Sequence, residues 1–174
     1  MEHAELGRRI YATAHLTGEF VLRSGQTTDQ YFDKYRFEAD PVLLDEVARA
    51  MVPLVPAGTE VLAGLEMGGI PVVTALARHT GLPCAFVRKQ AKPYGTARLA
   101  EGAETSGRRV TIVEDVVTTG GQIVLSTTEL RALGAYITDA LCVINRNPTT
   151  PPPLTTAGLT LHALFTSENL TPTA

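Results

Sequence analysis

Residues 110–122 read VTIVEDVVTTGGQ, an apolar run that ends in two adjacent acids and continues into a Thr-Thr-Gly-Gly turn. Residues 110–113 are rich in β-branched side chains and predict a strand, and residues 114–121 predict the turn. The segment Gln122–Leu133 predicts a helix that stops at Gly134. The sequence therefore places a glycine-containing turn between an apolar strand and the N-terminus of a helix.

This turn carries groups that suit a sugar phosphate. The backbone amides of residues 118–122 are expected to converge on a phosphate at the helix N-terminus, where glycines allow close approach and threonine hydroxyls add donors. Glu114 and Asp115 cannot bind phosphate, but carboxylates accept hydrogen bonds from vicinal ribose hydroxyls, and open α/β sheets bind ligands at the carboxyl ends of their strands. The alternative is an acid pair that only caps a loop before an ordinary helix start.

Strands and helices alternate on both sides of this segment. Residues 61–63 predict a strand that leads into the glycine-rich turn 64–69, and an apolar helix follows as far as His79. Further strands are predicted at Cys84–Val87, Ile137–Ile144 and Leu159–Phe165. The alternation predicts an α/β fold with a central, mostly parallel sheet flanked by helices, formed by residues 1–174 as a single domain.

The N-terminal third has a different pattern. Apolar residues at spacings of three and four predict an amphipathic helix over residues 5–16. Short β-prone runs on either side of the polar residues 24–29 predict an irregular hairpin. Asp40 as N-cap and Pro41 at the first position predict a second helix to about Val52. The segment 145–158 is predicted to be a loop, because three consecutive prolines cannot lie inside a helix.

Composition narrows the function. The chain has 174 residues, 15 Lys+Arg against 18 Asp+Glu, and a net charge of −3, so we expect no general nucleic-acid binding and no attraction to anionic membranes. No apolar run reaches the roughly 18 residues that a membrane span needs, and the first residues lack the apolar core of a signal peptide. Cys84 and Cys142 lie in apolar runs and are expected to be buried thiols. A cytoplasmic location is expected.

Residues 88–109 form a basic, weakly periodic stretch. It contains six of the 15 basic residues and two acids, Glu101 and Glu104. A long connection of this kind in a small domain is often a functional lid, although a solvated basic flap is the alternative. Next to a phosphate-binding turn, a cationic lid would neutralise a pyrophosphate while it is bound and while it leaves.

Several of these segments resemble the type I phosphoribosyltransferases, which use 5-phosphoribosyl 1-pyrophosphate (PRPP). Residues 113–121 are similar to the PRPP signature of that family. Three further stretches resemble the orotate phosphoribosyltransferases within it: residues 86–96 their mobile catalytic loop, residues 20–25 with 31–33 their N-terminal substrate segment, and residues 144–146 the place of an orotate-binding arginine. The resemblance extends from about Gly18 to Phe165.

The resemblance implies an enzyme that transfers ribose 5-phosphate from PRPP to orotate with Mg²⁺, in a homodimer whose loop 88–109 covers the partner's site. It implies a small hood, mainly from residues 17–40 and part of the C-terminal segment. Lys92 and Asp115 are the implied catalytic residues. The implied PRPP-binding residues are Arg88, Lys89, Lys92, Tyr94, Glu114, Asp115, Val116, Val117, Thr118, Thr119, Gly120, Gly121 and Gln122. The implied orotate-binding residues are Arg23, Thr118 and Arg146. The Mg²⁺ ion is expected to be held mainly by PRPP and water, with no direct protein side-chain ligand.

Two positions depart from the family pattern. Many relatives have a histidine where this chain has Tyr94, and some have a lysine where it has Gly68. A tyrosine can still donate a hydrogen bond to phosphate. Two alternatives stay open: a type I phosphoribosyltransferase for another base, such as a purine or uracil, and a non-catalytic regulator that senses PRPP.

Overall fold

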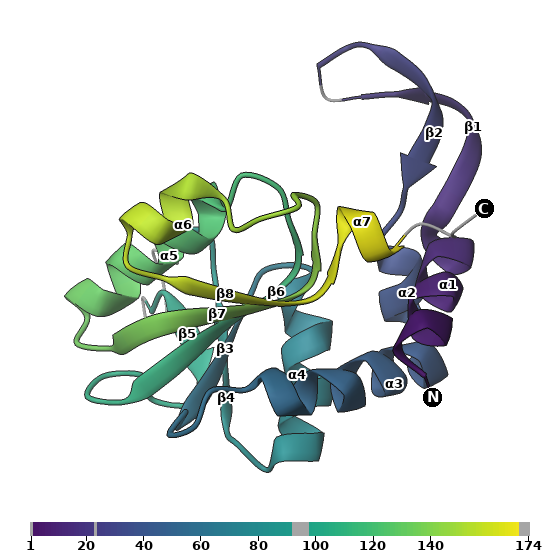
Figure 1. Cartoon of the computed structure of the whole chain (residues 1–174). Coiled ribbons are helices and arrows are strands. Elements are labelled where there is room, and N and C mark those ends of the chain that lie inside the picture. The colour runs from purple at the N-terminus through teal and green to yellow at the C-terminus, as the bar shows by residue number, and fades with distance from the viewer. Residues whose placement is uncertain (1, 23, 92–97, 171–174) are drawn as a thin grey trace.

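The computed structural model of the chain describes residues 2–22, 24–91 and 98–170. Helices and strands alternate through most of it (Figure 1). The elements are α1 (His3–Ala14), β1 (His15–Val21), β2 (Thr27–Phe32), α2 (Tyr35–Ala39), α3 (Pro41–Met51), β3 (Val61–Leu65), α4 (Gly69–Thr80), β4 (Cys84–Val87), β5 (Ala100–Gly102), β6 (Arg109–Val117), α5 (Gly121–Ala132), β7 (Tyr136–Asn145), α6 (Pro152–Thr156), β8 (Thr160–Thr166) and α7 (Ser167–Leu170).

The predicted sheet is confirmed. Its strand order is β5-β4-β3-β6-β7-β8, and every neighbouring pair is parallel except β4 and β5. Strand β6 lies inside the sheet, so Val113 pairs with Gly64 of β3 on one side and with Leu141 of β7 on the other. Because the parallel strands end at one edge, this edge gathers the turns that follow β3, β4, β6, β7 and β8.

Helices cover both faces of the sheet (Figure 1). Helix α4 packs on β3 and β6 from one side, and α5 packs on β6 and β7 from the other. Alternate residues of β6 join the two resulting cores: Val113 lies in the core beneath α1, α3 and α4, and Ile112 lies in the core beneath α5 and α6. Successive residues of a strand point to opposite faces of the sheet. Further along β6, the same alternation separates Glu114 from Asp115.

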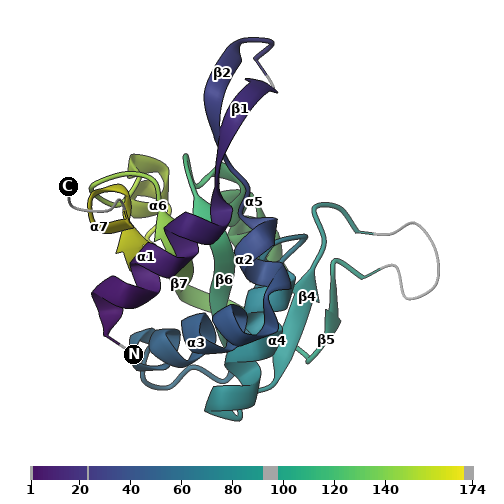
Figure 2. The ribbon, with the colours of Figure 1, turned by 90° about the vertical axis from the view of Figure 1, so that its right-hand side faces the viewer.

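The β1–β2 hairpin projects from the body of the molecule (Figures 1 and 2). The predicted irregular hairpin is confirmed, with a register shift between Thr17 and Phe20. The predicted end of the first helix is wrong: the helix stops at Ala14, and residues 15 and 16 already belong to β1. Their pairing with Phe32 and Tyr31 of β2 outweighs the helical spacing of the apolar side chains.

The other predicted elements differ mainly in their extent. The second helix is capped as predicted, because Asp40 Oδ1 accepts hydrogen bonds from the N–H groups of Val42 and Leu43, each at 3.0 Å. The predicted turn 114–121 is too long, since β6 continues to Val117. The predicted loop 145–158 contains the short helix α6, whose prolines occupy its first turn, where proline is tolerated. Helices α2 and α7 were not predicted.

Candidate active site

The glycine turn after β6 encloses a small hollow at the N-terminus of α5. The hollow has a volume of about 100 Å³ and is lined by Glu114 and residues 116–123. The first N–H groups of a helix have no acceptor within the helix, so the start of α5 points donors at this space. The turn predicted to cradle a phosphate therefore has a concave shape and the polarity for an anion.

Gly120 lets the turn close. Its φ is +77°, a left-handed conformation that favours glycine, and a Cβ built there would lie 2.8 Å from Leu154 Cγ. Leu154 belongs to α6 and is fully buried. Helix α6 thus packs against the glycine turn through Leu154. The sequence predicted a loop here and did not predict this contact.

The structure separates the two acids of the motif. Glu114 borders the hollow, whereas Asp115 points to the other side of β6 and is 0% exposed. Adjacent residues on a strand face opposite sides, so a strand that continues through both positions cannot present both side chains to one ligand in the same way. The two acids remain linked, because Asp115 N–H donates a hydrogen bond to Glu114 Oε1 at 3.2 Å.

Asp115 is surrounded by groups from two other parts of the chain, the segment at α2 and the turn after β3, as well as by its own neighbour Val116. Its Oδ1 accepts a hydrogen bond from Val116 N–H at 2.6 Å, and its Oδ2 forms an ion pair with Lys34 Nζ at 2.6 Å. Gly68, in the turn between β3 and α4, lies so close that a Cβ there would be 1.8 Å from Oδ2. Glu38 of α2 also adjoins Asp115; both of its carboxyl oxygens are buried, and neither has a hydrogen-bond partner among the described residues.

The four ionisable groups Lys34, Glu38, Glu114 and Asp115 shift one another's pKa values. Burial, reinforced by Asp115, raises the pKa of Glu38 to about 9, and burial together with Asp115 also raises the pKa of Glu114. Burial opposes ionisation of Asp115, but the adjoining Glu38, Lys34 and Glu114 side chains outweigh it and hold its pKa below the ordinary value. Burial likewise acts to lower the pKa of Lys34, and Asp115 overcomes it, so that pKa is raised. Asp115 and Lys34 are therefore a charged pair, and Glu38 is protonated at neutral pH.

Replacing Glu38 should flatten the dependence of stability on pH. Its pKa is about 9 in the folded protein against an ordinary 4.5, so between these values the folded state holds a proton that the unfolded state has lost. This contribution to the free energy of unfolding is fully present below pH 4.5 and is lost as the pH rises towards 9. We expect the melting temperature to fall less between pH 6 and pH 9 in Glu38→Gln than in the unmodified protein. Equal falls in both proteins would contradict a proton held by Glu38.

The turn after β3 and the basic stretch after β4 meet beside the cradle. Glu66 N–H donates a hydrogen bond to Val87 O at 2.8 Å, and a cis peptide bond joins Glu66 to Met67. The Glu66 carboxylate accepts a hydrogen bond from the backbone N–H of Lys89. The glycine turn 64–69 therefore adjoins the start of the predicted lid.

The predicted lid is shorter than residues 88–109. Residues 100–102 form β5, which pairs with β4, and Arg88 N–H donates a hydrogen bond to Leu99 O at 2.9 Å. Arg108 and Arg109 lie at the start of β6, the opposite edge of the sheet, where both approach Glu60. Their charges therefore do not belong to the lid, and the sequence argument overcounted its basic residues.

Among the predicted PRPP-binding cations, Arg88 and Lys89 are the two that the structure describes. Lys89 is exposed, and Arg88 is partly buried. The Nε atom of Arg88 lies 3.9 Å from Glu101 Oε1 and has no hydrogen-bond partner among the described residues. Lys92 and Tyr94, predicted for the same loop, and Arg23, predicted to bind the base, lie outside the described residues.

Arg146 borders a second hollow at the same sheet edge. Its N–H donates a hydrogen bond to Val117 O at 2.9 Å, which ties the end of β7 to the end of β6 beside the cradle. Its guanidinium lies 5.6 Å from the centre of the Phe32 ring. The hollow has a volume of about 210 Å³ and is lined by Tyr11, Phe32, Ile144, Arg146, Ser167 and Leu170. This hollow therefore combines the aromatic ring of Phe32, from the N-terminal segment, with the guanidinium of Arg146, at the end of β7.

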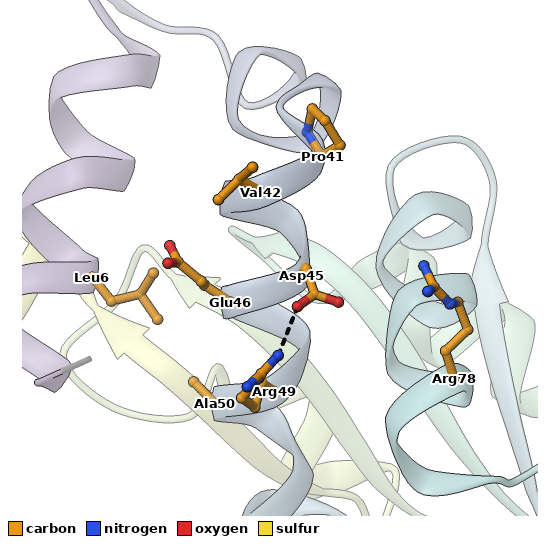
Figure 3. A pocket seen from close by; sticks show the side chains of 8 residues that line it. All are labelled: Leu6, Pro41, Val42, Asp45, Glu46, Arg49, Ala50 and Arg78. Atoms are coloured by element: carbon orange, nitrogen blue, oxygen red, sulfur yellow. Dashed lines mark hydrogen bonds and ion pairs between the residues drawn. The ribbon is translucent and has the colours of Figure 1, made fainter.

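A larger hollow lies away from these groups. It has a volume of about 650 Å³, between α1, α3 and α4 (Figure 3), and contains the ion pair of Arg49 with Asp45 at 3.0 Å. It is lined by Leu6, Pro41, Val42, Asp45, Glu46, Arg49, Ala50 and Arg78. None of the predicted site residues that the structure describes borders this hollow, so a large volume does not by itself identify the site.

Comparison with known proteins identifies the family. The profile of the phosphoribosyl transferase domain matches residues 37–161. A protein of Nocardioides sp. named orotate phosphoribosyltransferase is 51% identical over 167 residues, which are 96% of this chain and 93% of that protein. The chain belongs to the phosphoribosyl transferase family. The resemblance inferred from the sequence is thereby confirmed.

Solved structures of the family confirm the fold. The orotate phosphoribosyltransferase of Mycobacterium tuberculosis in complex with Fe(III) dicitrate has a TM-score of 0.86 and 28% identity, and the alignment covers 98% of this chain and 99% of that one. The same enzyme in complex with PRPP has a TM-score of 0.82 and 25% identity, with coverage of 97% and 98%. The type I phosphoribosyltransferase fold of this chain follows from these alignments.

Sequence reasoning missed Lys34 and Glu38. Both lie in the helical segment after the hairpin, 81 and 77 positions before Asp115, and no local pattern links them to it. One signal was available: the chain has three lysines and twelve arginines, and the lysines are Lys34, Lys89 and Lys92. Because Lys89 and Lys92 were already assigned to the site, the remaining lysine, Lys34, was a candidate for the same site.

Proposed function

We propose that this chain is an orotate phosphoribosyltransferase, which transfers ribose 5-phosphate from PRPP to orotate and releases pyrophosphate. The product is orotidine 5′-monophosphate, in the synthesis of pyrimidine nucleotides. The observation that carries the proposal is the cradle after β6, in a chain 51% identical to a protein named for this activity. Both cysteines are free thiols, as a reducing compartment favours, and the cytoplasm is the proposed location.

The residues have distinct proposed tasks. The amides and hydroxyls of residues 118–122 hold the 5′-phosphate at the start of α5. Glu114, which borders the hollow, accepts ribose hydroxyls, and Asp115, buried on the other side of β6, holds the turn at Gly68 in place. Arg88, Lys89 and Lys92 stabilise the charge that builds up on the departing pyrophosphate, as preorganised cations do in a site that excludes water. Bond breaking at the anomeric carbon passes through an oxocarbenium-like state.

The 210 Å³ hollow is the proposed place of the base. Arg146 can bind a carboxylate with two parallel hydrogen bonds, and Phe32 offers an apolar face beside it. This combination suits a flat, anionic pyrimidine such as orotate. A purine or uracil carries no carboxylate for the guanidinium, which disfavours the other bases.

Magnesium is the proposed cofactor, and it would neutralise pyrophosphate oxygens when bound. Among the residues that the structure describes, no three His, Cys, Asp or Glu side chains gather as metal ligands. Glu114 is the carboxylate that borders the cradle. This donor set fits a hard cation held mainly by substrate oxygens and water, as Mg²⁺ commonly is.

The test is loss of orotate absorbance with purified protein, PRPP and Mg²⁺, with uracil, adenine, guanine and hypoxanthine in parallel. We expect turnover of orotate alone, dependent on PRPP and metal. Turnover of another base instead of orotate would contradict the proposal and identify that base as the substrate. Binding of PRPP without consumption of any base would favour the non-catalytic regulator.

A shared site in a homodimer is also proposed, from the family resemblance. If Lys92 acts on the partner's cradle, then mixing Lys92→Ala with Asp115→Asn should restore activity, because one site of each heterodimer contains neither substitution. With random exchange, up to about one quarter of the sites in an equal mixture is complete. No recovery, with subunit exchange verified by mass spectrometry, would argue for a site within one chain.

No helix in the described part of the chain combines the length and the apolar character needed to cross a membrane.

A further inference from the structure

Lys34 is a cation beside the acid pair that the sequence motifs did not assign to the site. It directly precedes α2, and its ammonium lies 2.6 Å from Asp115 Oδ2 and 5.3 Å from the centre of the Tyr35 ring. Its side chain is about one-third exposed, whereas Asp115 is fully buried. The lysine thus reaches from the N-terminal segment to the strand that ends in the cradle.

The Asp115 carboxylate depends on this contact. One oxygen is held by Val116 N–H, and the other faces Lys34 and the backbone of Gly68. Removing the ammonium would leave a fully buried carboxylate beside two further carboxyl groups, Glu38 and Glu114. A buried charge without its partner is costly, so the carboxylate would take up a proton or move.

A shift of Asp115 would reach the cradle through the backbone. Asp115 N–H donates to Glu114 Oε1, and Glu114 borders the hollow together with residues 116–123. Gly68 lies in the turn that precedes α4, so this turn is in contact with the same carboxylate. Lys34 is therefore in contact with the side chain that faces the turn at Gly68, and that residue is hydrogen-bonded through its backbone to Glu114 of the cradle.

We propose that Lys34 is a positioning residue for PRPP: by holding Asp115 against the turn at Gly68, it sets the geometry of the acid pair at the cradle. The inference rests on the proposed function and deepens it. Lys34 acts through Asp115, and the base, which we place at Arg146 and Phe32, does not enter its role. Its loss should therefore weaken the use of PRPP more than the use of orotate.

The test compares Lys34→Met, which removes the charge at similar length, with Lys34→Arg, which keeps it. We expect Lys34→Met to lower kcat/KM for PRPP by about 10²-fold, the size of effect that a displacement of about 1 Å produces. The KM for orotate should stay within about threefold, and Lys34→Arg should recover at least a tenth of the wild-type value. Arg49→Met is the matched control, since it removes a cation from the exposed pair with Asp45 and should leave both constants unchanged.

A double-mutant cycle tests whether Lys34 acts through Asp115. In the Asp115→Asn background, Lys34→Met should change PRPP affinity, measured by calorimetry, less than about threefold, because the charge that it balances is gone. This double variant has no unpaired buried charge at the site, so it keeps the inference testable if Lys34→Met alone does not fold. An undiminished effect of Lys34→Met in that background would overturn the inference, as would equal losses for PRPP and orotate.

Calorimetry also separates this inference from the proposed function. A wild-type protein that binds PRPP but consumes no orotate would overturn the function, while the ranking of PRPP affinities would still test Lys34. Orotate turnover in the wild type, with wild-type PRPP constants in Lys34→Met, would overturn the inference alone.

Discussion

Lys92→Ala is expected to lower kcat by about 10²–10³-fold, the typical effect of removing one donor that stabilises charge in the transition state. Lys92 lies in the basic loop between β4 and β5, whose entrance is fixed beside the glycine turn by Glu66 and Lys89. In the proposed function, Lys92 stabilises the charge that builds up on the departing pyrophosphate. Steady-state kinetics at saturating PRPP and orotate measure the effect.

Arg98→Ala is the matched control for this loop. Arg98 lies at the far end of the same basic stretch and borders a different hollow, formed with Leu99, Ala103 and Leu133. Its removal changes the charge of the stretch equally but should alter kcat less than about threefold. Near-wild-type kcat in Lys92→Ala would remove its catalytic role, and equal losses in both variants would show a general effect of the loop's charge.

Gly68→Ala is expected to lower kcat/KM for PRPP by about 10²-fold or more. The new Cβ would lie 1.8 Å from Asp115 Oδ2 and 2.4 Å from Cγ, so either the turn or the carboxylate has to move. The carboxylate is held by Lys34 and Val116, and a displacement of about 1 Å at a binding site costs about 10²-fold. Overpacking should also lower the free energy of unfolding by about 1–3 kcal/mol.

Gly81→Ala is the control that separates a loss of stability from a loss of PRPP use. Gly81 has a φ of +73° at the end of α4, and no atom of the described residues lies within 4 Å of a Cβ built there. This substitution should lower stability by about 1–2 kcal/mol through backbone strain and leave kcat/KM unchanged. Denaturant titrations and kinetics of both variants test the difference. Wild-type kcat/KM in Gly68→Ala would show that the turn and Asp115 are free to adjust.

Much of the fold followed from local patterns. The alternation of apolar strands with helices predicted the parallel sheet, and Asp40 with Pro41 predicted the start of α3. These signals are reliable because strand burial and helix capping depend on residues close in sequence. The predictions failed where a local helical pattern competes with strand pairing between distant residues. Residues 15 and 16 continue the helical spacing of apolar side chains, yet they pair with β2.

The candidate site divides in the same way. The sequence alone determined the strand, the acid pair and the glycine turn of residues 110–122, since a phosphate-binding turn is built from consecutive backbone groups. Only the tertiary structure decided that Glu114 and Asp115 face opposite sides of β6, that Arg108 and Arg109 lie at the far edge of the sheet, and that Lys34 contacts Asp115. The reason is physical: the partner of a buried charge is selected by distance in space, and the chain brings Lys34 to Asp115 only when α2 packs beside the sheet.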